Sequence, residues 1–310
     1  MESKNVGLSV VIPVYDEEEN IQELYRRLKA VLLGVGKTYE IIFIDDGSRD
    51  KTSLILEELH FQDNGVKVLQ FARNLGQHIA FSAGLDFASG DIVLTMDGDL
   101  QDRPEDIPKL LDKMGEGYDV VCGKRMSRED PLFRKIISKI FYFLMRRLAD
   151  EETEIDTIVF RGMTRRVVEN VRQCQERNRY VIGLINWLGF PQTFVWVSHE
   201  ARFRGKSKYT MGKLFRLALD ATFSFSSRLL KVASVMGFFI SAIAFLMGLY
   251  FVWDMIAHDS SVSGYFSIIL SVFFLGGIQL IILGIVGEYV GRIYIETKGR
   301  PLYIIKKKIW

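Results

Sequence analysis

Cysteine is nearly absent from this sequence, since the 310 residues include only Cys122 and Cys174. The two lie too far apart in the chain to suggest a metal knuckle or a disulfide framework. Charge of one sign is not in excess either, with 40 Lys and Arg against 38 Asp and Glu. The chain therefore has no bulk electrostatic field that favours nucleic acid, and we expect no nucleic-acid partner.

Two phosphate-binding motifs are also missing. No G-x-G-x-x-G follows the first strand-like segment, and no G-x-x-x-x-G-K-[ST] occurs anywhere. Dinucleotide oxidoreductases and P-loop ATPases therefore lose their main support. The N-terminus lacks the basic-then-apolar pattern of a secretory signal, so we expect the first domain to stay in the cytoplasm.

From residue 8 to about residue 122, β-rich and helical segments alternate regularly. The strand-like segments are LSVVIPVY, YEIIFID, VKVLQF, DIVLTMD and DVVCG, and helical patterns begin at Glu17, Lys51, Gln77 and Pro104. Such alternation predicts a mostly parallel sheet covered by helices, and the more mixed residues 124–200 are interpreted as the acceptor side of a site.

Polar side chains gather where the predicted strands end. In sheets of this kind, ligands bind in the crevice beyond the carboxyl ends of the strands. The segments at those ends are Tyr15-Asp16-Glu17, Asp45-Asp46-Gly47-Ser48, Arg73-Asn74 and Asp97-Gly98-Asp99. The architecture and the polar residues therefore predict a site at the same edge.

Asp97 and Asp99 lie on the turn after the fourth strand-like segment. Two carboxylates at this spacing can share one hard cation with a diphosphate, and Mg²⁺ and Mn²⁺ take oxygen ligands. A bare Asp-x-Asp is weak evidence, but Gln101 and Asp102 follow it, and the position at a strand's carboxyl end strengthens it. We therefore expect a divalent metal, Mg²⁺ or Mn²⁺, as cofactor.

Other acidic residues have competing explanations. Asp45 or Asp46 could accept hydrogen bonds from ribose hydroxyls or a base N–H, whereas helix capping by Ser48 or Asp50 would explain part of the same segment. Asp156 stands alone on a strand-like stretch and is a candidate base, although an isolated acid can equally be structural.

Two long uncharged segments, 232–253 and 265–287, occur near the C-terminus. At about 1.5 Å per residue each can cross a hydrocarbon core of about 30 Å. Buried core helices are the alternative, but these segments lack the polar stripe of soluble helices. Lys and Arg flank the pair and are absent from the link, which places both ends in the cytoplasm.

A basic segment and a helical segment separate the first domain from these spans. Residues 202–208 carry four cations, which suit phosphate oxygens. Residues 209–228 fit an amphipathic helix lying in the membrane interface, with a plain core-facing helix as the alternative. We expect a lipid bilayer as a partner of this region.

Several ordered motifs resemble glycosyltransferase family 2. They are VIPVYDEEENI, FIDDGSRDKT, RNLGQHIAFSAGLDFASGD, MDGDLQDRPEDIPKL and RFRGKSKY. More narrowly, the chain resembles the polyisoprenyl-phosphate glycosyltransferases, relatives of dolichyl-phosphate mannose synthase that include bacterial undecaprenyl-phosphate (bactoprenol) glucosyltransferases. The resemblance runs from about residue 8 to the C-terminus and implies a Rossmann-like GT-A fold, inversion at the anomeric carbon and a divalent metal.

The resemblance also implies residue roles. The nucleotide-sugar would be held by Pro13, Tyr15, Glu17, Asp45, Asp46 and Asp97, and the metal by Asp99 and Gln101. Phosphates would meet Arg202, Ser207 and Lys208, and Asp156 would be the catalytic carboxylate. In the family this stretch commonly reads D-x-G-D-F-R, whereas here Val159 stands in place of the second acid, and Arg103 replaces a usual proline.

The resemblance implies an inverting enzyme that transfers a hexose, first of all glucose, from a UDP-sugar to the phosphate of a polyprenyl phosphate. The expected domains are a cytoplasmic GT-A domain (1–200), a basic and interfacial segment (201–230), a two-helix transmembrane hairpin (231–290) and a basic tail (291–310). The location would be a bacterial-type plasma membrane.

A homo-oligomer, by resemblance a tetramer, is expected, with Gly287-x-x-x-Gly291 as a packing motif. The alternatives are a nucleotide-sugar-binding scaffold without turnover, for which Val159 is the hint, and a processive polysaccharide synthase. The synthase is disfavoured because the segment Gln175–Arg179 does not match its Gln-x-x-Arg-Trp motif and two spans are too few for a channel.

Overall fold

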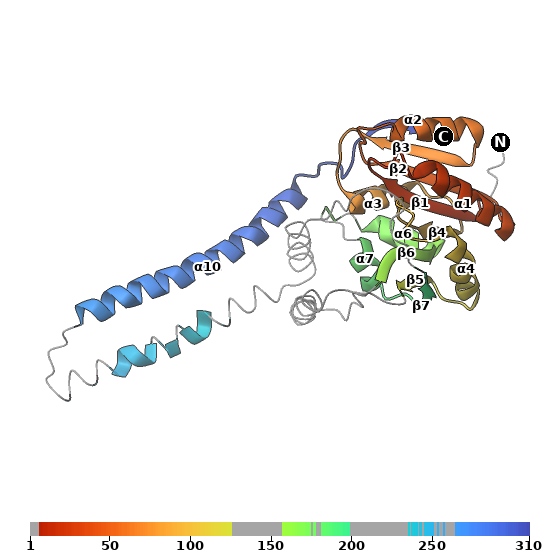
Figure 1. Cartoon of the computed structure of the whole chain (residues 1–310). Helices are drawn as coiled ribbons and strands as arrows, with labels where there is room; N and C mark the ends of the chain where they lie inside the picture. The colour runs from red at the N-terminus through yellow and green to blue at the C-terminus, as the bar shows by residue number, and fades with distance from the viewer. Residues whose placement is uncertain are drawn as a thin grey trace. The chain divides into compact units, whose positions relative to one another are not determined.

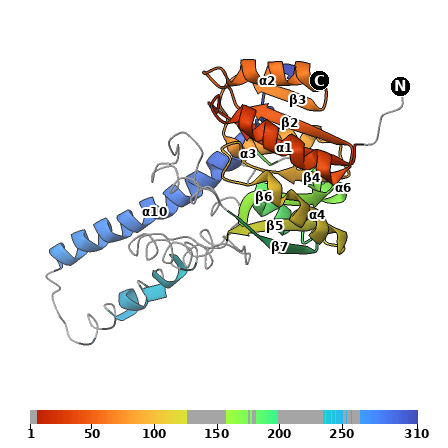
Figure 2. The ribbon, with the colours of Figure 1, turned by 45° about the vertical axis from the view of Figure 1, so that its right-hand side comes forward.

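The computed structural model divides into two compact units (Figures 1 and 2). The first comprises Met1–Tyr142, Glu151–Leu214 and Arg300–Trp310, and the second Phe143–Asp150 and Phe215–Gly299. The structure describes residues 6–125, 157–174, 176–177, 181–198, 235, 237–240, 242–243, 245–250, 253, 257 and 264–310. The predicted helix after residue 132, the basic segment 202–208 and the interfacial helix 209–228 lie outside these residues.

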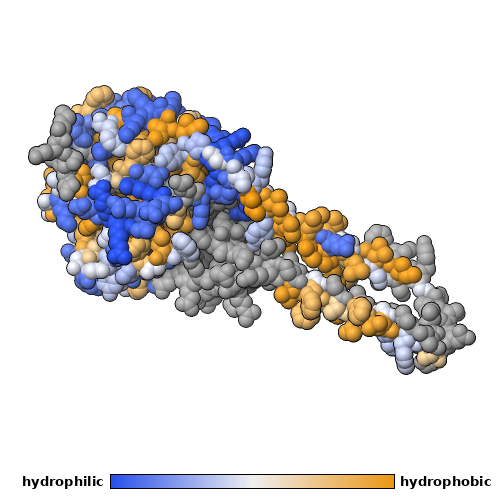
Figure 3. Space-filling view, turned by 180° about the vertical axis from the view of Figure 1, so that it is seen from behind, coloured by the Kyte–Doolittle hydropathy of each residue, from blue (hydrophilic) through white to orange (hydrophobic). Residues whose placement is uncertain are grey.

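The second unit contains one long helix, α10 (Tyr265–Thr297), whose side chains are mostly apolar and exposed (Figure 3). Within it, Phe274–Thr297 is the one stretch among the described residues that is long and apolar enough to cross a membrane. The first predicted span, 232–253, is described only in part and includes a shorter apolar helix, Gly237–Tyr250. Two spans are therefore not established by the described residues.

The helix α10 continues ten residues past Gly287, where the sequence analysis ended the second span. Its first charges, Glu288 and Arg292, stand four residues apart and form an ion pair of 3.0 Å. Such a pair supports a helix, so the charges do not end it. Thr297 is the last helical residue, so α10 extends into residues 291–297 of the predicted basic tail.

The first unit is built on one eight-stranded sheet with the order β7-β5-β6-β4-β1-β2-β3-β8. The pairs β1–β2, β1–β4, β2–β3 and β5–β7 are parallel, and the other three are antiparallel. The strands are β1 (Leu8–Val14), β2 (Tyr39–Asp45), β3 (Val66–Phe71), β4 (Ile92–Thr95), β5 (Val120–Arg125), β6 (Thr157–Thr164), β7 (Gln192–Val197) and β8 (Ile305–Ile309). The predicted α/β fold with a mostly parallel sheet is confirmed.

Helices cover both faces of this sheet, as the parallel pairing requires. On one face lie α1 (Ile21–Val35), α2 (Thr52–Gln62), the short 3-10 helix η1 (Pro104–Asp106) and α4 (Ile107–Gly115). On the other lie α3 (Gln77–Phe87), α6 (Arg165–Gln173) and α7 (Val181–Trp187).

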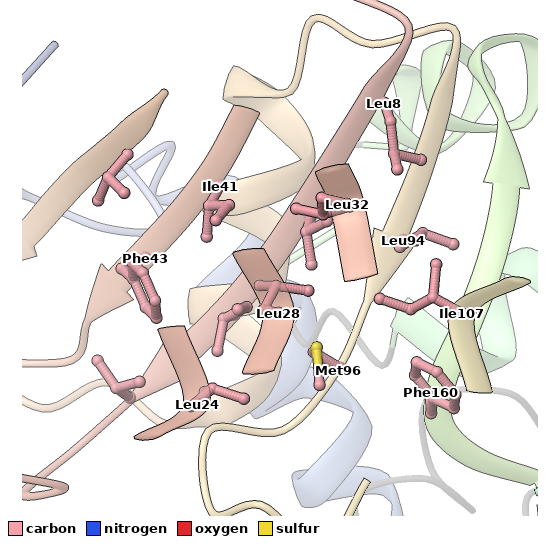
Figure 4. Packing of buried hydrophobic residues seen from close by; sticks show 14 of the residues in the cluster. Leu8, Leu24, Leu28, Leu32, Ile41, Phe43, Leu94, Met96, Ile107 and Phe160 are labelled. Atoms are coloured by element: carbon pink, nitrogen blue, oxygen red, sulfur yellow. The ribbon is translucent and has the colours of Figure 1, made fainter. Parts of the chain in front are cut away.

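The strand β1 is buried along its whole length, and its apolar side chains pack alternately on the two faces of the sheet. Val10 and Ile12 pack in the cluster with α1, α2 and α4, whereas Val11 packs in the cluster with α3, α6 and α7. Figure 4 shows Leu24, Leu28 and Leu32 of α1 pointing into the first cluster. This core fixes the strands whose carboxyl ends carry the polar loops.

The strand β8 was not predicted, because its sequence Ile-Lys-Lys-Lys-Ile belongs to the segment interpreted as a basic tail. It pairs antiparallel with β3, and a bulge interrupts the register between Gln70 and Phe71. An extra residue turns the following side chains to the opposite face. Ile305 therefore packs on one core cluster and Ile309 on the other, while the lysines stay exposed.

Candidate functional site

The polar loops meet where the direction of the sheet order changes. From β1 the chain builds β2 and β3 on one side, and then places β4 on the other side of β1. Loops at such a switch point leave in opposite directions and open a crevice at the carboxyl ends of the strands. The segments that follow β1 and β4, which contain Tyr15 and Asp97, flank this point.

The loops after β1 and β2 are fastened to each other by reciprocal hydrogen bonds. The Asp16 amide donates to Ser48 Oγ at 3.0 Å, and the Arg49 amide donates to Asp16 Oδ1 at 2.8 Å. The Glu17 amide donates to Thr52 Oγ1 at 2.9 Å. Asp16 adopts a left-handed φ of 49° to make this turn. Residues 15–18 are thus held as one rigid edge of the site.

Ser48 binds this neighbouring loop and does not cap α2, so that part of the capping interpretation is wrong. Asp50 comes closer to the expected role, because its Oδ1 accepts a hydrogen bond from the Thr52 amide at 2.9 Å at the start of α2. The helix α1 begins at Ile21, later than the predicted start, because Glu17 to Asn20 form a turn.

Asp45 and Asp46 are both buried and both make hydrogen bonds within the protein. Asp45 accepts from the Ser48 amide at 2.9 Å and from the Ser53 hydroxyl. Asp46 accepts from the amides of Leu75 and Gly76 at 2.7 and 2.9 Å, which belong to the loop after β3. Burial raises the pKa of Asp46 above its usual value, and the amide bonds only partly offset this.

The turn after β4 is anchored in the core on both sides of its acidic residues. Met96 and Leu100 are buried members of one core cluster, and Leu100 takes a left-handed φ of 62°. Asp99 between them is 7% exposed and accepts a hydrogen bond from the Gln101 amide at 3.1 Å. A non-glycine residue with positive φ is held only by its surroundings, so the fold specifies where Asp99 stands.

Asp97 and Asp99 supply carboxylate oxygens, which are the ligands that a divalent cation prefers, and two carboxylates are a usual number for such a site. Magnesium-type ions are bound by one or two carboxylates together with substrate phosphates, not by a cage of protein ligands alone. Within the described part of the chain, no group of three or more His, Cys, Asp or Glu converges on one point. Asp99 and Gln101 remain the predicted metal residues.

Gln77, which the sequence analysis did not assign, links two of the loops. It is the first residue of α3, and its side-chain amide donates a hydrogen bond to Asp97 Oδ1. Asp97 therefore depends on the loop after β3 as well as on its own strand. The sequence signal for this residue is its place three residues after Asn74, at the start of a predicted helix and within the motif RNLGQHIAFSAGLDFASGD.

A second unassigned feature is the pair of His78 and Arg161, which line one cavity with Thr95. Arg161 on β6 stands opposite Thr95 in the sheet register and is 2% exposed. It lines a small cavity of about 10 Å³ together with His78 and Val159. Desolvation lowers the pKa of His78 below 6.5, and the Arg161 charge lowers it further, so His78 favours the neutral form. In the sequence Arg161 matches the final residue of the family pattern D-x-G-D-F-R, which assigned it no role.

Replacing Gly47 with Ala is expected to lower the free energy of unfolding by more than the cost of its left-handed backbone conformation. Gly47 has φ +73°, and an added Cβ would lie 2.7 Å from the Arg73 carbonyl carbon. The left-handed conformation costs about 1–2 kcal/mol for a non-glycine residue, and the steric contact adds to it. Gly36→Ala is the matched control, because φ is +71° there and an added Cβ has open space. Denaturant unfolding should show the larger loss for Gly47→Ala, and equal losses would contradict the packing described.

The structure thus brings together Pro13, Tyr15, Glu17, Asp45, Asp46, Asp97, Asp99 and Gln101 at one edge of the sheet. Pro13 differs from the rest because it is buried within β1. Asp156, Arg202, Ser207 and Lys208 lie outside the described residues, so their predicted roles stay predictions.

Comparison with known proteins identifies relatives over almost the whole chain. A family model described as glycosyl transferase family 2 matches residues 9–172. An uncharacterized glycosyltransferase of Synechocystis sp. is 42% identical, covering 97% of this chain and 95% of its own. The SfII prophage-derived bactoprenol glucosyl transferase of Shigella flexneri is 41% identical, covering 97% of each chain.

Among solved structures, glucosyl-3-phosphoglycerate synthase from Mycobacterium tuberculosis, in complex with Mn²⁺, UDP-glucose and phosphoglyceric acid, aligns with a TM-score of 0.47. It is 21% identical, and the alignment covers 69% of this chain and 76% of that chain.

Proposed function

Because the chain belongs to glycosyltransferase family 2, we propose that it transfers glucose from UDP-glucose to the phosphate of a polyprenyl phosphate such as undecaprenyl phosphate. The observation that carries the proposal is the similarity to a bactoprenol glucosyl transferase over 97% of both chains. Similarity of that extent includes the C-terminal helix as well as the sheet domain. It therefore supports a shared lipid acceptor, beyond a shared donor domain.

The carboxylates at the switch point suit the donor half of this reaction. We propose that Asp99 and Gln101 hold a divalent cation, Mg²⁺ or Mn²⁺, and that Asp97 stands beside the nucleotide with Tyr15, Glu17, Asp45 and Asp46. The bound ion would neutralise charge on the departing diphosphate. The burial of Asp99 and its core-anchored turn support this role, because a carboxylate held in place needs no rearrangement to bind.

The transfer is a single displacement at the anomeric carbon. An oxygen of the lipid phosphate forms a bond to this carbon while the bond to the diphosphate oxygen breaks, so UDP leaves and the configuration inverts. A phosphate monoester has a second pKa of about 6, so the nucleophile is already largely dianionic near neutral pH. Asp156 is therefore proposed to orient the acceptor, with Arg202, Ser207 and Lys208 binding phosphate.

The helix α10 is proposed as part of a membrane anchor. Its exposed apolar surface supports insertion in a bilayer, and we propose residues 232–253 as the other span and both termini on the cytoplasmic side. The chain that follows α10 enters the first unit at residues 300–304, beside the end of β3 and hence at the site edge of the sheet.

A homo-oligomer is proposed to assemble through the glycine-bearing side of α10. An added Cβ at Gly287 or Gly291 would meet nothing within 4 Å, which leaves room for the close approach of another helix. Light scattering of the purified protein in detergent, corrected for bound detergent, measures this, and a monomer would contradict it.

The transferase proposal predicts formation of a lipid-linked sugar from purified components. Full-length protein in detergent is incubated with labelled UDP-glucose, Mn²⁺ or Mg²⁺, and undecaprenyl phosphate, and organic-phase label is measured. We expect product only when the lipid is present, loss of product with excess chelator, and lower rates with GDP-mannose. Binding of UDP-glucose without transfer to any polyprenyl phosphate would instead favour a non-catalytic scaffold.

A further inference from the structure

The loop after β3 joins β3 to α3. The residues just before β8 contact both of these elements. The ring of Tyr303 stacks on Phe71 at the end of β3, with centroids 5.4 Å apart and planes 10° from parallel. Its hydroxyl donates a hydrogen bond of 2.9 Å to Asp86 near the end of α3. The carbonyl of Ile304 accepts a hydrogen bond of 3.1 Å from the Ala72 amide, the first residue after β3.

The loop held in this way, residues 72–76, supports the proposed donor site. Its amides at Leu75 and Gly76 donate to the Asp46 carboxylate. Directly after it, Gln77 donates to Asp97. A displacement of the loop would therefore change the surroundings of both carboxylates, one on each side of β1.

The loop 72–76 is also closely packed, so it has little freedom to move without changing the surroundings of Asp46 and Asp97. Its backbone at Arg73 and Asn74 packs so closely on Gly47 that an added Cβ would lie 2.7 and 2.8 Å from it. Leu75 packs on the same core cluster as Tyr303 and Ile305. The segment 303–305 thus contacts a loop whose Leu75 and Gly76 amides donate hydrogen bonds to Asp46.

We propose that this C-terminal segment is a positioning element of the donor site, with Tyr303 as its main positioning residue. The inference rests on the proposed function, because it concerns the site to which a nucleotide-sugar is assigned. Tyr303 does not touch the donor in this proposal; it acts through residues 72–77. Only residues 298–302 separate it from α10, so the stretch of chain after the candidate span also determines donor binding.

Two substitutions of Tyr303 separate the contributions of its ring and its hydroxyl. Tyr303→Phe removes the bond to Asp86 and keeps the stacked ring, whereas Tyr303→Ala removes both. Lys307→Ala is the matched control in the same C-terminal segment, because it removes an ion pair of 2.7 Å to Glu57 on α2 and leaves the loop contacts in place. Thermal unfolding of each variant shows whether the fold is retained.

The first readout needs no substrate. Hydrogen exchange of a peptide covering residues 72–77, which includes the Leu75 and Gly76 amides, should be faster in Tyr303→Ala than in wild type or Lys307→Ala. The second readout is the affinity for UDP with Mn²⁺, measured by calorimetry. Loss of one hydrogen bond predicts about 2- to 10-fold weaker binding in Tyr303→Phe, and a larger loss in Tyr303→Ala. The KM for polyprenyl phosphate should stay within twofold.

These readouts separate the inference from the proposed function. Unchanged exchange of residues 72–77 in a folded Tyr303→Ala protein would overturn the positioning role, whatever the enzyme transfers. Unchanged UDP affinity with faster exchange would overturn the link to the donor site. Failure of the proposed function would appear differently, as absence of transfer by wild type, and would leave the exchange result valid.

Discussion

The Asp99→Asn variant is expected to transfer sugar at least about 100-fold more slowly than wild type, because electrostatic stabilisation by a bound cation is worth several kcal/mol. Asparagine keeps the size of the side chain and an oxygen that can accept the hydrogen bond from the Gln101 amide. It removes the negative charge that a divalent cation requires. The loss should therefore appear in kcat and in metal dependence, while the fold is retained.

Asp112→Asn is the matched control for this substitution. Asp112 is exposed on α4, away from the carboxyl edge of the sheet, and the chemical change is the same. Initial rates are measured over a series of Mn²⁺ concentrations for wild type and both variants. Full activity of Asp99→Asn at wild-type metal concentrations would exclude Asp99 as a metal residue.

Much of the donor domain could be predicted because local and tertiary signals agree there. The apolar segment at β1 is buried on both faces, as expected for a central parallel strand, and the order of elements specifies which loops share an edge. The acidic turns after β2 and β4 then come together without any further information. Periodicity alone therefore predicted the place of the site, and the family motifs added residue roles.

The strand β8 could not be predicted, because its signal depends on its partner. Ile305 and Ile309 are four residues apart, and an unbroken strand would place them on one face with Lys307. Only the bulge opposite Gln70 and Phe71 allows the two isoleucines to enter different core clusters. Three lysines in a row resemble a solvated tail, and at a sheet edge they also protect against further strand pairing.

The chemistry of individual site residues was harder to predict than their location. Asp45 and Asp46 have motifs typical of ligand binding, yet each carboxylate already accepts two hydrogen bonds from the protein. Gln77 and Arg161 lie within motifs that gave them no role, and only the packing of α3 and β6 brings them close to β4 and the turn after it. Such side-chain contacts depend on tertiary structure and have no periodicity.

The largest stability effect is expected at the opposite edge of the sheet, where Glu40 is 1% exposed. Its carboxylate accepts hydrogen bonds from Lys67 Nζ at 2.5 Å, from the Ser9 hydroxyl, and from the amide and hydroxyl of Ser89 at 2.7 and 2.8 Å. Removing one partner of a buried ion pair leaves the other charge poorly solvated. Glu40→Gln is therefore expected to lower the free energy of unfolding by about 3 kcal/mol.

The matched control is Glu23→Gln, since Glu23 pairs with Arg26 on the exposed surface of α1. Exposed pairs contribute little, so we expect no measurable change in the denaturant midpoint. Both variants should keep wild-type kcat, because neither residue lies at the carboxyl edge. Equal midpoints for Glu40→Gln and wild type would show that the buried network does not stabilise the sheet.

The same carboxylate makes stability depend on pH in a direction that can be derived. Burial raises the pKa of Glu40, but the bonds from Lys67, Ser9 and Ser89 outweigh it and hold the pKa below the ordinary value of 4.5. The unfolded chain therefore binds a proton at a higher pH than the folded protein does. The stabilisation is complete above pH 4.5 and is lost as the pH falls through the folded pKa. Denaturant midpoints measured from pH 7 downward should fall more steeply below pH 4.5 in wild type than in Glu40→Gln, which has no carboxyl group to protonate at this position.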